Sequence, residues 1–233
     1  CISCAHSSFE QKQLKHALNF ATSNRLELEI LLQHYTYDSL KLEAAKFLIR
    51  NMPHCYSYQQ GGEMDSVKRV RTYYSPFGQI DQTYARRWGH YTYRNLPKIY
   101  DAHIITAEYL IDNIDRAFDN WQKRPWNRSL SFEDFCEYLL PYRIGDEPLE
   151  EWRELYEKKY GYLLDSIYKG SDVVEAANLV SRHLQEPVFI YCEDFELPHI
   201  GPRYLFSHRY GSCVDAADIV TYAFRAVGIP CME

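Results

Sequence analysis

Apolar residues recur every three or four positions over most of the chain before residue 186, the spacing of one face of an α-helix. The clearest stripes start near residues 26, 39 and 106. Their members are Leu28, Leu31, Leu32 and Tyr35, then Leu40, Ala44, Phe47 and Leu48, then Leu110, Ile114, Phe118 and Trp121. This pattern predicts a helical region over residues 9–185, with little strand before Val188.

Residues that begin and end helices support this segmentation. Ser8 and Asn24 each precede Gln or Glu by three positions, which is the spacing of a capping box. Asp38 is expected to cap the segment that Pro53 ends. Further helices are expected from Ser131 to Pro141, from Pro148 in a first turn through Leu149, Trp152, Leu155 and Tyr156, and over residues 171–184.

The pattern changes after Glu186. Residues 187–192 form a short apolar, β-branched run that predicts a strand, and two proline-containing loops follow. Helical spacing then returns. Val214, Ala217, Val220, Phe224 and Val227 predict a buried stripe, and Gly228 followed by Pro230 predicts the end of that helix.

Charge and composition exclude several functions. The formal net charge is −6, so no overall basic field attracts nucleic acid. Short basic clusters, including residues 68–71, are interpreted as solvated faces. Seven cysteines at irregular spacing do not form a disulfide framework, and we expect neither a metal nor a cofactor.

The first eight residues suggest an attachment. Cys1 is followed by a short, mostly polar segment, as in bacterial lipoproteins whose first residue bears a lipid. We therefore expect residues 1–8 to be a tether, Cys1 to be lipid-anchored, and the protein to lie at the cell surface or in the periplasm. An arbitrary boundary of the sequence is the alternative.

Cys213 is the main candidate for chemistry. It falls in the first turn of the predicted helix, after Gly211, where unpaired N–H groups and the helix dipole favour a thiolate and lower a thiol pKa. The same N–H groups can stabilise an oxyanion. From spacing alone, a buried and inert cysteine is an equal alternative. Asp215 and Asp218 are interpreted as partners of the helix dipole.

Residues 210–230 resemble the nucleophile helix of the transglutaminase-like superfamily. The matching positions are Gly211, Cys213, Ala217, Arg225, Ala226, Gly228, Ile229 and Pro230, about a tenth of the chain. The resemblance implies a fold that is mainly α, in which a helical region leads into the first part of a papain-like α+β core over residues 186–233. It also implies Cys–His–Asp chemistry on peptide or protein amides, with Cys213 as nucleophile.

The sequence departs from this family in one respect. Histidine and aspartate follow the nucleophile in the family, whereas residues 214–233 contain no histidine. We therefore expect a piece of such an enzyme that is inactive by itself. His199 and His208 lie upstream and are weak candidates for a base, and a zinc site formed by both with Cys192 and Cys213 matches no established spacing. A non-catalytic binding or scaffold protein with a degenerate fold is the alternative function.

Overall fold

A computed structural model of the protein describes residues 2–74, 83, 93–191 and 197–232, with side chains from residue 8 onward. Helix accounts for 68% of it and strand for 5%, which confirms the prediction of a mainly helical chain. Cys1 and Cys192 lie outside the described residues. The segment expected to be a tether is helical from Ile2, so Ser8 lies inside the first helix and does not begin it.

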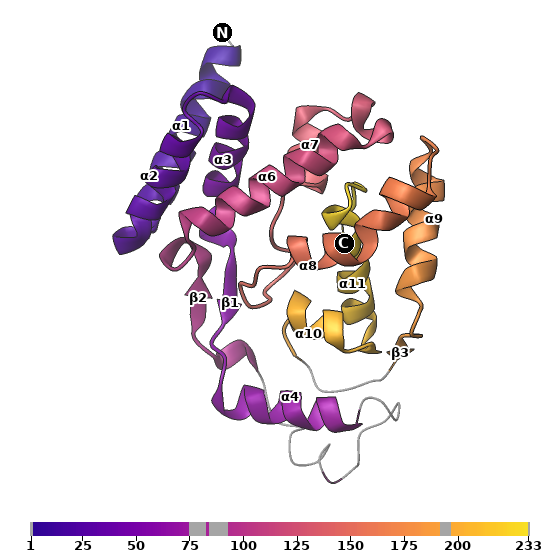
Figure 1. Ribbon diagram of the computed structural model, residues 1–233. Helices are drawn as coiled ribbons and strands as arrows, with labels where there is room; N and C mark the ends of the chain where they lie inside the picture. Colours follow the sequence, from indigo (N-terminus) through magenta and orange to yellow (C-terminus); the bar gives the residue numbers. More distant parts are fainter. Residues whose placement is uncertain (1, 75–82, 84–92, 192–196, 233) are drawn as a thin grey trace.

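The first half of the protein is a layer of antiparallel helices crossed by one long helix (Figure 1). The layer comprises α1 (Ile2–Phe20), η1 (Thr22–Asn24), α2 (Arg25–His34), α3 (Ser39–Asn51) and η2 (Met52–His54). The crossing helix is α6 (Ala107–Lys123), followed by η6 (Pro125–Ser129) and α7 (Phe132–Tyr138). Three side chains cap their own helices: Asp38 accepts from Lys41 N, Thr106 from Tyr109 N, and Ser131 from Asp134 N.

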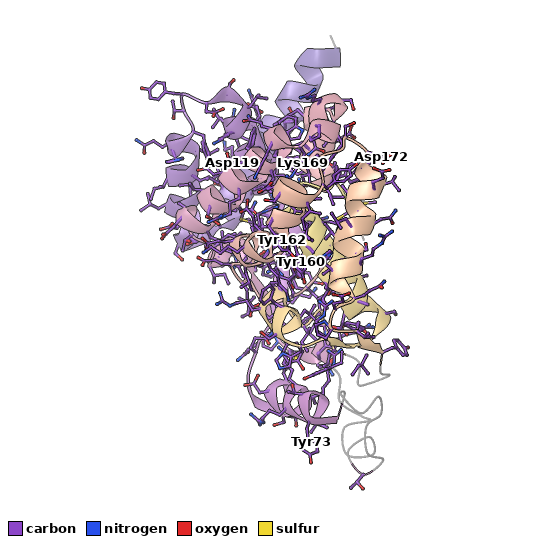
Figure 2. The ribbon with its side chains drawn as sticks, turned by 45° about the vertical axis from the view of Figure 1, so that its right-hand side comes forward. Tyr73, Asp119, Tyr160, Tyr162, Lys169 and Asp172 are labelled. Atoms are coloured by element: carbon purple, nitrogen blue, oxygen red, sulfur yellow. The ribbon has the colours of Figure 1, made fainter. Side chains whose placement is uncertain are left out.

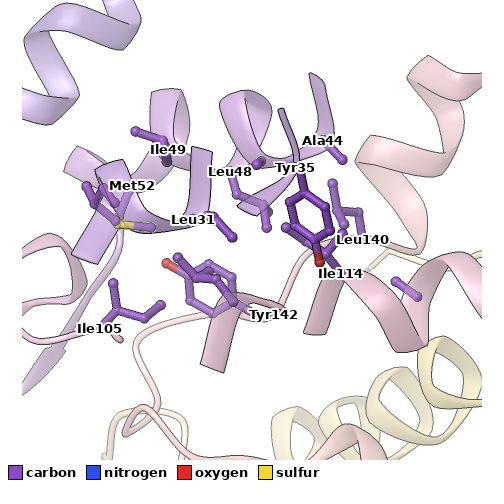
Figure 3. Close-up of a cluster of buried hydrophobic side chains, with 14 of the residues drawn as sticks. Leu31, Tyr35, Ala44, Leu48, Ile49, Met52, Ile105, Ile114, Leu140 and Tyr142 are labelled. Atoms are coloured by element: carbon purple, nitrogen blue, oxygen red, sulfur yellow. The ribbon is translucent and has the colours of Figure 1, made fainter. Parts of the chain in front are cut away.

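A single apolar cluster holds these helices together (Figure 3). Its members include Leu31 from α2, Tyr35 directly after α2, Leu48 and Ile49 from α3, and Ile114 from α6, all buried. Burial of a side chain of this size contributes about 1.5–3 kcal/mol. The stripes predicted from the sequence are therefore the faces that meet in this core, although Leu40 is exposed.

A narrow extension leaves this layer between α3 and α6. Strands β1 (Tyr56–Tyr58) and β2 (Lys98–Tyr100) pair antiparallel, with η5 (Asp101–His103) directly after β2. Helix α4 (Gly62–Tyr74) and η4 (Tyr93–Asn95) lie at the far end of the extension. As a result α4, from the first third of the chain, lies beneath the C-terminal helices in Figure 1.

The second half is built around the last helix, α11 (Cys213–Ala226). Around it lie α8 (Arg153–Tyr162), the π-turn η7 (Leu163–Ile167), α9 (Val173–Leu184) and α10 (Pro202–Ser207). Strands β3 (Ile190–Tyr191) and β4 (Tyr210–Gly211) form a short parallel pair. A second apolar cluster joins these helices, and it includes Trp152, Tyr156, Val180 and Tyr222. The change from the first cluster to the second falls near residue 150.

Helix α2 starts where the sequence predicted, directly after Asn24, but the predicted capping box does not form. Asn24 precedes α2 but makes no cap for it; its amide donates to Ala102 O and Ile105 O at 3.1 and 2.8 Å. Glu27 likewise accepts from Ala107 N at 2.7 Å. These side chains hold the start of α6, a contact between residues about 80 positions apart that a local motif does not reveal.

Pro148 does not begin a helix, because the chain around it is held as a loop. Glu147 accepts from the N–H groups of Ile144 and Gly145, both at 2.8 Å. Trp152 Nε1 donates to Tyr142 O at 2.8 Å, and α8 starts only at Arg153. The expected strand over residues 187–192 is found only at Ile190–Tyr191 in the described part of that segment.

Helix α11 ends just before Gly228, as predicted. Gly228 has a φ of 83°, and Ile229 N donates to Phe224 O at 2.9 Å, as in a Schellman motif. Gly228 O also accepts from Trp126 Nε1 and Asn127 Nδ2, both at 2.9 Å. A Cβ at Gly228 would lie 2.8 Å from Asn120 O, so this end of α11 is packed directly on α6 and η6.

We expect Gly228→Ala to lower the free energy of unfolding by about 2–5 kcal/mol, because the left-handed φ and a backbone clash both oppose a methyl group. Gly61→Ala is the matched control: Gly61 also has a positive φ, 99°, but nothing lies within 4 Å of its Cβ position. We expect Gly61→Ala to cost only about 1–2 kcal/mol. Urea denaturation of both variants measures the difference, and equal losses would contradict the packing argument.

Candidate functional site

Cys213 is the first residue of α11, and its side chain is exposed. The first hydrogen bond within the helix runs from Ala216 N to Ser212 O, at 3.2 Å. The N–H groups of Cys213 and Val214 precede that bond, so they belong to the unpaired donors of a helix start. The thiol therefore lies at a solvent-accessible position next to backbone donors.

The start of α11 is fixed by a capping box. Ser212 and Asp215 cap each other: the Ser212 side chain accepts from Asp215 N, and Asp215 Oδ2 accepts from Ser212 N at 2.8 Å. Ser212 Oγ also lies 2.8 Å from the same carboxylate oxygen. Asp215 is 4% exposed and lies in the first turn of α11, so this acidic residue at the positive end of the helix dipole is also an inward-facing cap.

An arginine from the distant helix α4 completes this cap. Arg71 Nη2 donates to Asp215 Oδ2, and the two side chains are almost fully buried. Gly211 leaves the space for this pair, since a Cβ there would lie 2.5 Å from both Arg71 Nη2 and Asp215 Oδ2. The interpretation of residues 68–71 as a solvated face is therefore wrong for Arg71, which is 1% exposed.

The buried face of α11 differs from the stripe that the sequence predicted. Val214 is 41% exposed, and Val220 and Phe224 are only partly buried, whereas Val227 is fully buried. The inward face instead consists of Asp215, Asp218, Ile219, Tyr222, Ala223 and Ala226. The prediction failed because two aspartates occupy positions that an apolar pattern assigns to solvent.

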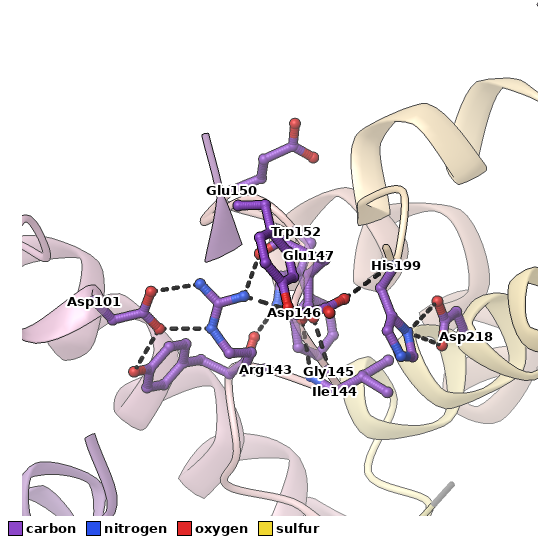
Figure 4. Close-up of polar contacts among 12 residues, drawn as sticks. Asp101, Arg143, Ile144, Gly145, Asp146, Glu147, Glu150, Trp152, His199 and Asp218 are labelled. Carbon is purple, nitrogen blue, oxygen red and sulfur yellow. Dashed lines mark hydrogen bonds and ion pairs between the residues drawn. The ribbon is translucent and has the colours of Figure 1, made fainter. Parts of the chain in front are cut away.

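Asp218 pairs with His199, as Figure 4 shows. His199 Nδ1 lies 2.9 Å from Asp218 Oδ2 and 3.1 Å from Oδ1, and the Asp218 side chain is completely buried. Five residues separate Cys213 from Asp218, which places the two side chains roughly 140° apart around the helix axis. His199 is thus bound on a different face of α11 from the thiol.

The other histidine considered as a base is also held elsewhere. The His208 ring stacks on Tyr204 with centroids 4.1 Å apart, and its Nδ1 lies 2.9 Å from Tyr204 O. Both histidines therefore have partners other than Cys213, so the contacts favour neither as a base for this thiol. His–Asp pairing on α11 was not foreseen in the sequence, where residues 199 and 218 share no motif.

A charged cluster fixes the loop beside His199 (Figure 4). Arg143 donates to both oxygens of Asp101 and to Glu147 O, and Tyr142 OH donates to Asp101 at 3.0 Å. The loop contacts the histidine at two points: His199 N donates to Asp146 Oδ1 at 2.9 Å, and the ring leaves no room for a Cβ at Gly145. This cluster therefore positions His199, and through it Asp218.

The cysteines with described side chains differ sharply in environment. Burial raises the pKa of Cys136 to about 12 and that of Cys55 to about 11, and it also raises the pKa of Cys231. Cys213 is the exposed member of these four. The raised pKa values disfavour the thiolate at these three cysteines, and Cys136 is in addition buried.

No metal site or membrane span emerges from the part of the chain that the structure describes. Within it, no three His, Cys, Asp or Glu side chains are grouped to hold a metal ion. Nor is any of its helices both long and apolar enough to cross a membrane. A cavity of about 340 Å³ lies between α3 and residues 141–145, with Phe47, His54, Cys55 and Arg143 in its wall; none of its lining residues belongs to α11.

We expect iodoacetamide at neutral pH to modify Cys213 faster than Cys136 by on the order of 100-fold or more. Cys136 must both open and ionise before it reacts, and its raised pKa leaves almost no thiolate. Peptide mapping by mass spectrometry over a time course measures both rates. Comparable rates would show that the start of α11 is not accessible in solution.

Comparison with known proteins identifies no relative. No family model, no curated protein and no solved structure matches this chain. The resemblance of residues 210–230 to a nucleophile helix thus depends on those residues alone.

Proposed function

We propose that Cys213 is the thiol nucleophile of a transglutaminase-like cysteine hydrolase or acyltransferase that acts on peptide or protein amides, and that residues 1–233 by themselves do not turn over amides. The observation that supports this most is the exposure of Cys213 at the start of a helix whose remaining turns are anchored in the interior. A structural cysteine has no need of that position.

The arrangement of α11 supports the proposal in three ways. The cap formed by Ser212 and Asp215 fixes the backbone on both sides of the thiol. The pairing of β4 with β3 fixes the residues that lead into the cap. At the other end, Gly228 ends the helix in the position that the nucleophile-helix resemblance implies.

In the proposed reaction, the Cys213 thiolate attacks the carbonyl carbon of an amide, and the C–N bond then breaks. The leaving amine takes a proton from water, and the acyl group remains on sulfur as a thioester. Water or a second amine then takes the acyl group and regenerates the thiol. The N–H groups of Cys213 and Val214 are placed to stabilise negative charge on the carbonyl oxygen during the attack.

An activated ester tests the nucleophile without a proton donor for the leaving group. We expect a p-nitrophenyl ester of a short N-acylated peptide to acylate Cys213, since p-nitrophenolate leaves without protonation. Release of p-nitrophenolate and mass spectrometry of the adduct measure the reaction. Cys213→Ser should abolish the adduct on that peptide.

The matched control separates a nucleophilic site from an exposed thiol. Ile30 is 41% exposed within α2, so Ile30→Cys in the Cys213→Ser background places a thiol in mid-helix. The rate of alkylation by iodoacetamide measures thiolate reactivity in both proteins. Backbone N–H donors accelerate only acylation, because only that reaction forms an oxyanion. We expect the ratio of acylation to alkylation to be roughly 10-fold or more higher for Cys213. Equal ratios would refute the proposed function and favour a non-catalytic binding protein.

A further inference from the structure

Arg71 is separated from Cys213 by most of the chain but meets the cap of the same helix. Its guanidinium donates to Asp215, two residues after the thiol, and both side chains are shielded from water. Arg71 faces inward from α4, whereas Tyr73, two positions further on, is 67% exposed and points away from the body of the protein (Figure 2).

Further contacts hold this part of α4 against the C-terminal half. Thr72 Oγ1 lies 2.8 Å from Tyr204 OH on α10. Tyr210 OH donates to Thr72 O at 3.3 Å, and Tyr210 belongs to β4, immediately before the cap. The end of α4 therefore contacts α10, β4 and the start of α11 together.

The cap creates an electrostatic conflict that Arg71 resolves. The Asp215 side chain accepts from both Ser212 groups, and a carboxylate charge two residues from a thiol opposes formation of a thiolate. Burial prevents water and salt from screening that charge. A buried cation bonded to the carboxylate cancels the charge and leaves the capping geometry intact.

We infer that Arg71 is a positioning and charge-compensating residue for Cys213: docking of α4 onto the cap keeps the thiol nucleophilic while Asp215 orients the helix start. This inference rests on the proposed function of Cys213. Reactivity of the thiol at the end of the chain therefore depends on a helix from its first third.

The test compares single and double variants of Arg71 and Asp215 in the full chain. The quantity measured is the alkylation rate of Cys213 at neutral pH. Arg71→Met leaves the Asp215 charge uncompensated, so we expect the rate to fall by roughly 3–10-fold. Asp215→Asn keeps an oxygen for the cap and removes the negative charge two residues from Cys213, so the rate should rise. The double variant should lie close to the unmodified protein, and Arg71→Lys should retain most of the rate because it retains the charge.

A merely structural role predicts a different pattern. In that case Arg71→Met and Asp215→Asn would both slow alkylation or both leave it unchanged, whatever their effect on thermal stability, and the inference would be overturned. If Arg71→Met does not fold, Asp215→Asn alone decides, since a rate that fails to rise refutes charge compensation. The two proposals can fail separately. If the charge variants behave as expected but the ratio of acylation to alkylation is no higher for Cys213 than for the Ile30→Cys control, only the proposed function of the site is refuted.

Discussion

Asp215 and Asp218 project from neighbouring turns of α11 into the interior, where a carboxylate without a partner would cost several kcal/mol. Three residues apart, they lie roughly 60° from each other around the helix. Each finds its partner in a different segment: Arg71 on α4 and His199 in the loop before α10. The need to pair these two charges therefore determines which distant segments pack against α11.

Hydrogen bonds from buried arginines join the two halves of the protein. Arg153 donates to the carbonyl groups of Leu139, Leu140, Pro141 and Arg225. Burial, followed by the charge of Arg225, lowers the pKa of Arg153 to about 9. Arg124 donates similarly to Val227 O at 2.8 Å. Because these bonds are directional, they fix how α11 lies on the helices of the first core more precisely than apolar contact does.

Local signals in the sequence were sufficient for most of the first half. Asp38 and Ser131 cap helices within their own next turn, so a short motif contains all the information needed. Gly228 is a similar case at a helix end. Asn24 shows the limit: the same residue type in the same spacing bonds to a segment about 80 positions away.

The candidate site was predictable only in part, for the same reason. Cys213 at a helix start followed from local residues, whereas the capping box of Ser212 and Asp215 is seen only in the structure. Arg71 did not follow from local residues, because it lies in a short basic cluster that is typical of a solvated face and its partner lies 144 positions away. The buried face of α11 was also mispredicted. Hydrophobic periodicity assigns charged residues to the solvent side, whereas Asp215 and Asp218 are paired and buried.

The position of the exposed thiol follows from the same buried aspartate. Cys213 precedes Asp215 by two residues, which separates their side chains by roughly 200° around the axis of α11. Once Arg71 and the cap turn Asp215 inward, Cys213 must face outward. The opposite end of α11 is covered by Trp126 and Asn127, which bond to Gly228 O. Any chemistry of this helix is thereby confined to its N-terminal turn, where the thiol and the helix-start N–H groups occur together.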